Sequence, residues 1–79
     1  MQSDVKDLLL TIVSPLVKNP EDIRLELIEG QEFMEYHLSV ADEDMGRIIG
    51  KQGRIIQAIR TVLYSVPVQG KKVRLLVNQ

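Results

Sequence analysis

The chain contains no cysteine, so it can form neither a disulfide bond nor a thiolate metal site. Its single histidine cannot hold a metal ion alone. The longest uninterrupted apolar runs are three residues, which is far too short to span a membrane. The first residues also lack the basic and apolar regions of a signal peptide. These absences predict a cytoplasmic protein with no membrane contact and no metal or other cofactor, held together by packing alone.

Aromatic side chains are also scarce, because Phe33, Tyr36 and Tyr64 are the only three. A broad platform on which several RNA bases stack is therefore not expected, and Tyr36 is expected to pack in the core. The sequence shows no pairing of a nucleophile with a base and no cluster of metal ligands. We therefore do not expect an enzyme.

Acidic residues are absent from residues 45–79, whereas residues 1–44 hold all eleven of them. The first segment carries −8 and the second carries +7, so the net charge of −1 conceals a strongly basic half. A basic half suits a polyanion such as nucleic acid. A charge dipole used for packing or self-association is the alternative.

Three segments show the apolar alternation of β-strands, at residues 23–29, 33–40 and 72–77. A short connection that includes Gly30 separates the first two, which predicts an antiparallel hairpin. The inward-facing residues are expected to be Ile23, Leu25, Leu27, Met34, Tyr36, Leu38, Val40, Val73, Leu75 and Val77.

An amphipathic helix is predicted over residues 3–17, with Ser3 as its N-cap. Pro15 should interrupt this helix near Ser14, because its ring removes a backbone donor and clashes one turn back. Apolar residues at helical spacing form the face that packs in the core. This face is made of Val5, Leu8, Leu9, Ile12, Val13 and Leu16.

Two further helices are predicted between the second and third strands. Asp42 is the expected N-cap of a short helix over residues 43–49. A second helix is expected over residues 54–65, ended by Pro67. Its buried residues are expected to be Ile55, Ile56, Ile59, Val62 and Leu63. The element order is therefore α-β-β-α-α-β, which predicts an α+β fold with helices on one face of a three-stranded sheet.

The connection between these two helices, Gly50-Lys51-Gln52-Gly53, is the segment of the sequence that indicates a binding site. Gly50 can end the first helix in a left-handed conformation, and Gly53 can begin the next helix without a side chain in the way. The loop directs a helix N-terminus at an approaching ligand, and the absence of side chains lets a phosphodiester backbone come close. Lys51, Arg47 and Arg54 add positive charge.

Other glycine motifs fit this segment less well. A Walker loop needs four residues before Gly-Lys and then Ser or Thr, whereas Gly46 lies only three residues before Gly50 and Gln52 follows Lys51. The spacing also does not supply a dinucleotide-binding fingerprint. A helix-hairpin-helix DNA binder remains open, although it leaves the strands unexplained. A purely structural helix–turn–helix corner is a further alternative.

The eight residues from Ile49 to Ile56 match the I-G-x-x-G-x-x-I core of the KH domain, which the chain resembles. The element order is similar to the type II form of bacteria, and the resemblance covers residues 1–79 as a single KH domain with its GxxG loop at residues 50–53. More narrowly, the chain resembles the small single-domain KH proteins of bacteria.

This resemblance implies binding of single-stranded RNA in a groove beside the GxxG loop. Gly50 and Gly53 would admit the RNA backbone and Lys51 and Gln52 would meet phosphates, whereas Ile49 is more structural. The loop Val66–Lys71 would be the variable loop, with Lys71 and Lys72 on the far wall of the groove. The implied RNA-binding residues are Arg47, Ile49, Gly50, Lys51, Gln52, Gly53, Arg54, Lys71 and Lys72.

The resemblance also implies a homodimer and pairing with a larger Jag-type KH protein (KhpB). The expected role is that of a post-transcriptional regulator or RNA chaperone in cell elongation and division. Independently, the apolar arc of the helix over residues 54–65 spans roughly 160°, more than a small sheet and one helix need to cover. The surplus predicts a two-fold contact, with a generous core stripe as the alternative. A KH scaffold used only for protein assembly is a further alternative.

Overall fold

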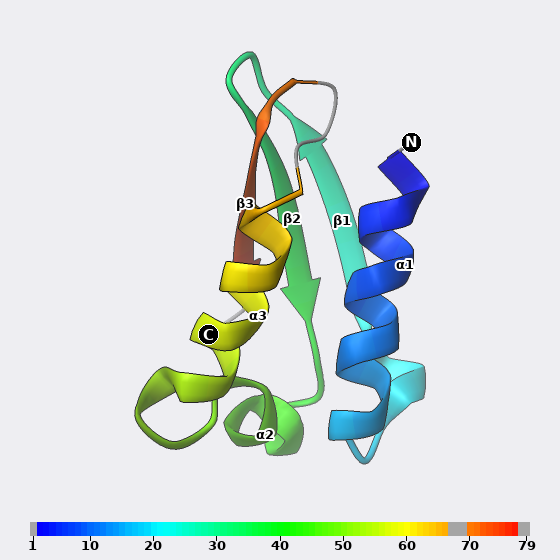
Figure 1. Ribbon diagram of the computed structural model, residues 1–79. Coiled ribbons are helices and arrows are strands. Elements are labelled where there is room, and N and C mark those ends of the chain that lie inside the picture. The colour runs from blue at the N-terminus through cyan, green and yellow to red at the C-terminus, as the bar shows by residue number, and fades with distance from the viewer. Residues whose placement is uncertain (1, 67–69, 78–79) are drawn as a thin grey trace.

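The computed structural model describes residues 2–66 and 70–77. In these ranges three helices cover one face of a three-stranded sheet and leave the other face open (Figure 1). The elements are α1 (Gln2–Val13), η1 (Ser14–Leu16), η2 (Pro20–Asp22), β1 (Arg24–Glu29), β2 (Phe33–Ser39), η3 (Asp42–Asp44), α2 (Met45–Ile49), η4 (Lys51–Gly53), α3 (Arg54–Tyr64) and β3 (Lys72–Val77), where η denotes a 3₁₀ turn. The predicted α+β class and the order α-β-β-α-α-β are confirmed.

The sheet has the strand order β1-β2-β3, so β2 is the central strand. β1 pairs with β2 in antiparallel register, with Leu25 opposite Leu38, which confirms the hairpin. β3 lies parallel to β2, with Leu75 opposite Tyr36. A parallel pair needs a long crossover, and the chain between β2 and β3, which includes α2 and α3, provides it. This crossover places the loop between α2 and α3 beyond the end of β2 (Figure 1).

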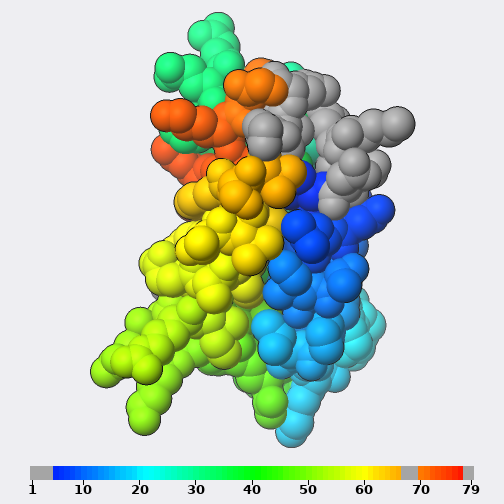
Figure 2. Space-filling view, in the orientation of Figure 1, coloured from blue at the N-terminus to red at the C-terminus, as the bar shows by residue number. Residues whose placement is uncertain are grey.

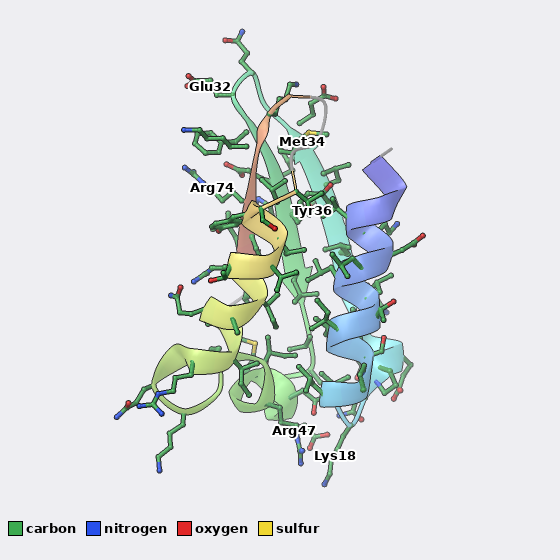
Figure 3. The ribbon with its side chains drawn as sticks, viewed as in Figure 1. Lys18, Glu32, Met34, Tyr36, Arg47 and Arg74 are labelled. Carbon is green, nitrogen blue, oxygen red and sulfur yellow. The ribbon has the colours of Figure 1, made fainter. Side chains whose placement is uncertain are left out.

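The core lies between the sheet and the helices. From α1, Val5, Leu9 and Val13 are buried at helical spacing, as predicted. α1 ends at Val13, which confirms the predicted interruption by Pro15, and a 3₁₀ turn over Ser14–Leu16 follows. The remaining buried apolar residues are Met34, Tyr36, Leu38, Val40, Ile48, Ile56, Ile59, Leu63, Val73 and Leu75. Figure 3 shows Met34 and Tyr36 pointing from β2 toward the helices.

Both predicted N-caps are wrong. α1 begins at Gln2, so Ser3 lies inside the helix rather than before it. Asp42 begins the turn η3, and no side chain caps either this turn or α2. The acid with structural contacts at this place is Asp44, which is fully buried and accepts hydrogen bonds from the backbone N–H groups of Lys18 and Asn19 at 2.9 and 3.0 Å. Asp44 thereby ties the exit of α1 to the start of α2.

Two apolar residues of α3 are not buried as predicted. Ile55 is 37% exposed and Val62 is 46% exposed, because the core contacts only the stripe formed by Ile56, Ile59 and Leu63. Leu27 of β1 is 39% exposed for a related reason, since β1 is an edge strand with a neighbour on one side only. The predicted terminator of α3, Pro67, lies outside the described residues.

Candidate nucleic-acid interface

The loop between α2 and α3 is a tight turn built from three residues with positive φ. Gly50 has φ 76° and ψ 175°, Gln52 has φ 59° and ψ 27°, and Gly53 has φ 73° and ψ 15°. The N–H of Gly50 donates to the carbonyl of Gly46 at 2.8 Å and closes α2. The N–H of Gly53 donates back to the carbonyl of Gly50 at 3.2 Å and closes the turn. The predicted positive φ at Gly50 is confirmed, and Gly53 shares it, which the sequence analysis did not predict.

The two glycines are required for different reasons. A Cβ at Gly50 would lie 2.5 Å from Cγ1 of Ile55, so this position has no room for a side chain. A Cβ at Gly53 would meet only Cγ2 of Ile56, at 4.0 Å, which is an ordinary contact. Protein atoms therefore fill the space at Gly50, whereas the side of Gly53 is open. A backbone that approaches the turn closely does so at Gly53.

The side chains at the tip of the loop are exposed and positively charged. Lys51 and Arg54 form no ion pair within the described part of the chain, and Nη2 of Arg54 donates to Oε1 of Gln52 at 3.4 Å. No side chain caps the N-terminus of α3, so its first backbone N–H groups add positive potential at the same place. The loop projects from the body at the lower left of Figure 2.

The other predicted binding residues do not join this tip. Arg47 is directed toward Asp44, with Nε 3.7 Å from Oδ1, on the side of α2 that faces Lys18 (Figure 3). Ile49 packs against the core. Lys71 and Lys72 lie at the opposite end of the sheet, where β3 begins (Figure 1).

The cations at that far end differ in their partners. Nζ of Lys71 lies 2.8 Å from Oε2 of Glu29 and donates to the carbonyl of Gly30 at 2.7 Å. Lys72 stands opposite Phe33 in the register of the sheet. The structure therefore brings together Gly50, Lys51, Gln52, Gly53 and Arg54, and it places the two lysines elsewhere.

The sequence analysis did not predict that the buried Asp44 would link the end of α1 to the start of α2. The backbone N–H of Lys18 and both the side chain and backbone of Asn19 hold the pKa of the Asp44 carboxylate below its ordinary value, and Arg47 adds to this effect. Burial acts in the opposite direction and is outweighed. The run of acids at residues 42–44 was the available signal, but it pointed equally well to a negatively charged first turn of a helix.

Two interactions at the edge of β3 were also not foreseen. Nε of Arg60 donates to the carbonyl of Leu75 at 3.3 Å, and the N–H of Leu75 donates to Oη of Tyr64 at 3.2 Å. α3 thus uses two side chains to cover the outer backbone groups of Leu75. Arg60 and Tyr64 are four residues apart on one helix face, which was the signal available in the sequence.

Within residues 2–66 and 70–77, no group of three or more histidine, aspartate or glutamate side chains is placed to hold a metal ion. Nε2 of His37, the one histidine, is 3.0 Å from Oε1 of Glu35. Within the same ranges, every helix is too short or too polar to cross a bilayer.

α2 and α3 are joined by a GxxG turn and pack on a three-stranded sheet, and an additional helix and strand, α1 and β1, precede them in the chain. This arrangement defines a KH domain of type II. Comparison with protein families agrees with this, since residues 6–77 match the KH domain of KhpA and KhpB. The chain belongs to this family.

Curated relatives match almost the whole chain. A protein of Lactiplantibacillus plantarum, named RNA-binding protein KhpA, is 50% identical over 77 residues, covering 96% of this chain and 91% of the relative. The protein of the same name from Listeria monocytogenes is 51% identical over 72 residues, covering 90% and 95%. That from Streptococcus pneumoniae is 43% identical over 75 residues and covers 95% of both chains.

Proposed function

We propose that this protein is a single KH domain over residues 1–79 that binds short single-stranded RNA through its GxxG loop. The observation that carries the proposal is the exposed turn at residues 50–53, with Lys51 and Arg54 unpaired within the described residues and the uncapped N-terminus of α3 behind it. The relatives named as RNA-binding proteins support the same conclusion. The protein acts by binding, not by catalysis.

The loop residues have distinct roles in this proposal. Gly53 lets the sugar-phosphate backbone approach the turn, and Gly50 sets the shape of the turn against Ile55. Lys51 and Arg54 neutralise phosphates, while Gln52 can donate from its amide nitrogen as its oxygen accepts from Arg54. Contacts of this kind carry little base specificity, because they reach the backbone rather than base edges.

A double substitution at the tip tests this function. Lys51→Asp with Gln52→Asp places two negative charges where phosphates must approach, on an exposed turn. We expect RNA affinity to fall at least tenfold at low salt, while circular dichroism and the melting temperature change little. Lys6→Asp with Thr11→Asp, on the exposed surface of α1, alters the net charge by the same amount and serves as control. Equal affinities of the two double variants would refute binding at the loop.

We further propose a homodimer that forms through α3. Ile55, Ala58 and Val62 are exposed at helical spacing, so they form an apolar stripe on the face of α3 away from the core. A two-fold contact through this stripe brings two GxxG loops onto one RNA, and two weak sites then gain affinity through effective concentration. The same stripe can accept a KhpB/Jag-type KH protein, which makes the homodimer and heterodimer competitors.

Sedimentation equilibrium tests the dimer. The wild-type chain should sediment above 9.0 kDa at micromolar concentration, and Val62→Asp should return it to the mass of one chain. Thr61→Asp, at the exposed neighbouring residue, is the matched control and should remain dimeric. A wild-type mass of 9.0 kDa at high micromolar concentration rejects the homodimer.

The stripe also supports a second candidate function, a scaffold for protein assembly with little RNA binding. The loop variant separates the two candidates, because it should weaken RNA binding at least tenfold but leave the protein partners of a scaffold bound. In the proposal that we favour, the protein acts in the cytoplasm as a post-transcriptional regulator or RNA chaperone. Its partner there is a KhpB/Jag-type protein and its setting is cell elongation and division, as family resemblance implies.

A further inference from the structure

The fold protects one edge of the sheet and leaves the other open. At the β3 edge, the side chains of Arg60 and Tyr64 bond the outer carbonyl and N–H of Leu75. At the β1 edge, no strand pairs with the outer side of β1 within the described residues (Figure 1). An edge strand with unpaired backbone groups is a template on which another strand can pair.

The register of the hairpin shows which backbone groups of β1 are unpaired. The N–H of Gly30 donates to the carbonyl of Phe33 at 2.8 Å, so these two residues form a hydrogen-bonded pair next to the turn. Such pairs recur at every second residue of an antiparallel ladder. Residues 24, 26 and 28 therefore bond to β2. The N–H and carbonyl groups that point to the free edge belong to Leu25, Leu27 and Glu29.

β1 also lacks the devices that usually keep an edge strand from pairing. It is six residues long and contains neither proline nor glycine nor lysine. Leu27, on the face of the sheet that carries the helices, is 39% exposed, and Ile28, on the open face, is 41% exposed. A strand added beside β1 would cover apolar surface on both faces of the sheet, in addition to pairing the backbone.

The charge around this edge favours a basic partner. Residues 20–30 hold four acids and one cation, a net charge of −3, and all five side chains are exposed. The cation, Arg24, is directed back to its own turn, where Nη1 donates to the carbonyls of Glu21 and Ile23 at 2.9 and 3.0 Å. Glu26 forms no ion pair within the described part of the chain. Complementary charge selects the partner of such a surface.

A second copy of the chain fits this edge poorly. Two β1 strands can pair through their outward backbone groups in two antiparallel registers that overlap by five residues. One register places Glu26 directly opposite Glu26 of the other copy, and like charges in this position are destabilising. The other register places Glu26 opposite Ile28, which takes water from a carboxylate without supplying a partner.

We propose that the free edge of β1 binds an extended basic segment of a partner protein, which adds a fourth strand antiparallel to β1. Backbone hydrogen bonds to residues 25, 27 and 29 hold the segment. Its basic side chains lie opposite Glu26 and Glu29, and its apolar side chains cover Leu27 and Ile28. This interface lies on the other side of the molecule from the GxxG loop (Figure 1), so it does not depend on RNA binding.

Amide hydrogen exchange measured by NMR tests the proposal on the wild-type chain. The probe is the acetylated peptide Lys-Val-Val-Lys-Val, whose residues in antiparallel register lie opposite residues 29 to 25. In the free protein the amides of Leu25, Leu27 and Glu29 should exchange rapidly. With about nine-tenths of the protein bound to peptide, they should exchange about tenfold more slowly, because exchange proceeds from the remaining free protein. The amides of Glu26 and Ile28, already bonded to β2, should change little.

Altered peptides separate backbone pairing from charge. N-methylation of the third and fifth peptide residues removes N–H donors that face β1 and should abolish binding, whereas N-methylation of the second and fourth should not. The acidic peptide Glu-Val-Val-Glu-Val should bind much more weakly than the basic one. In the protein, Glu26→Lys should weaken binding of the basic peptide about fivefold or more. Glu32→Lys, the same charge change at an exposed residue between β1 and β2, is the matched control and should have little effect.

Four outcomes would overturn the inference. The first is that the basic peptide does not bind at its highest soluble concentration. The second is that both methylated peptides bind equally well, which would exclude strand addition. The third is equal affinity for the acidic and basic peptides, which would exclude charge selection. The fourth is protection of the outward amides of β1 that rises with protein concentration in the absence of peptide, because a second copy would then occupy the edge. None of these outcomes affects the proposed RNA site at the GxxG loop.

Discussion

Replacing either loop glycine by alanine should give two very different losses of stability. Gly50 has φ 76° and ψ 175°, a region that only glycine visits readily, and this costs another residue about 1–3 kcal/mol. Its added Cβ would also approach Ile55 within 2.5 Å of Cγ1 and 2.8 Å of Cβ. Relief of such overpacking in a well-packed site typically costs a further 1–3 kcal/mol or so. Gly50→Ala should therefore destabilise the fold by about 2–6 kcal/mol.

Gly53→Ala is the matched comparison within the same turn. Gly53 has φ 73° and ψ 15°, a left-handed conformation that costs alanine about 1–2 kcal/mol. Its Cβ meets no close neighbour, and alanine recovers about 0.4–1 kcal/mol by restricting the unfolded chain. The net loss should be about 1 kcal/mol. Since 1 kcal/mol corresponds to about 4–8 °C in a domain of this size, the two melting temperatures should differ by at least 4 °C or so.

Urea denaturation followed by circular dichroism, at one fixed protein concentration, measures both losses. The double variant Gly50→Ala with Ile55→Ala removes two of the three close contacts, so it should be about 1 kcal/mol more stable than the sum of the single losses predicts. If the two glycine variants lie within 1 kcal/mol or so of each other, or if positions 50 and 55 show no coupling, the steric argument is refuted.

Three other substitutions test single features of the fold. Asp44→Asn keeps one acceptor oxygen but turns its amide N–H₂ toward the second of the two backbone donors, so the melting temperature at pH 7 should fall by about 5–10 °C. Because folding lowers the pKa of Asp44, its contribution to the free energy of unfolding is present above about pH 4 and is lost as the pH falls further. A pH series of melting curves should show this loss in the wild-type protein but not in Asp44→Asn. Tyr36→Phe removes a buried hydroxyl without a hydrogen-bond partner in the described residues, so its melting temperature should stay equal or rise by up to about 5 °C, and a clear fall would contradict this. Gln52→Gly removes the cost of holding a residue with a side chain at positive φ, so it should raise the melting temperature by a few degrees in the same assay. A lower melting temperature would mean that the hydrogen bond from Arg54 to Gln52 stabilises the fold by more than this cost.

Features of the fold that depend on local periodicity could be predicted from the sequence. The alternation over residues 33–40 places Met34 and Tyr36 inward because side chains of a strand change face at every residue. The stripe of α1 and the interruption at Pro15 follow from helical geometry in the same way. The positive φ at Gly50 could be predicted because few other residues tolerate it.

Features that depend on distant contacts could not be predicted. Asp44 meets the backbone of Lys18, 26 residues away, and nothing in the local pattern distinguishes it from a helix cap. The exposure of Ile55 and Val62 depends on where α3 packs, since periodicity gives the direction of an apolar face but not the width that a neighbour covers. Lys71 was expected on the far wall of the groove, but its distance from the GxxG loop could not be predicted, because it depends on the parallel register that places the start of β3 at the opposite end of the sheet.

In the folded protein, several cations of the basic half of the chain already have polar partners. Three of its cations have carboxylate partners, since Lys71 pairs with Glu29, Arg74 with Glu35 and Arg47 with Asp44. A fourth cation, Arg60, donates a hydrogen bond to the backbone carbonyl of Leu75 in β3. Within the described residues, the cations without such partners are Lys51, Arg54 and Lys72.

These three cations lie at two places, since Lys51 and Arg54 are beside the GxxG loop and Lys72 is where β3 begins. Counterion release follows phosphates that are actually neutralised, not the number of basic residues in a segment. RNA long enough to span α3 should therefore bind with a salt slope of about −2, which corresponds to three phosphates at roughly 0.7 each. The seven basic residues of the segment, if all took part, would give about −5. Affinities measured at several salt concentrations decide between them, and a slope near −5 would mean that RNA breaks the ion pairs of Lys71, Arg74 and Arg47.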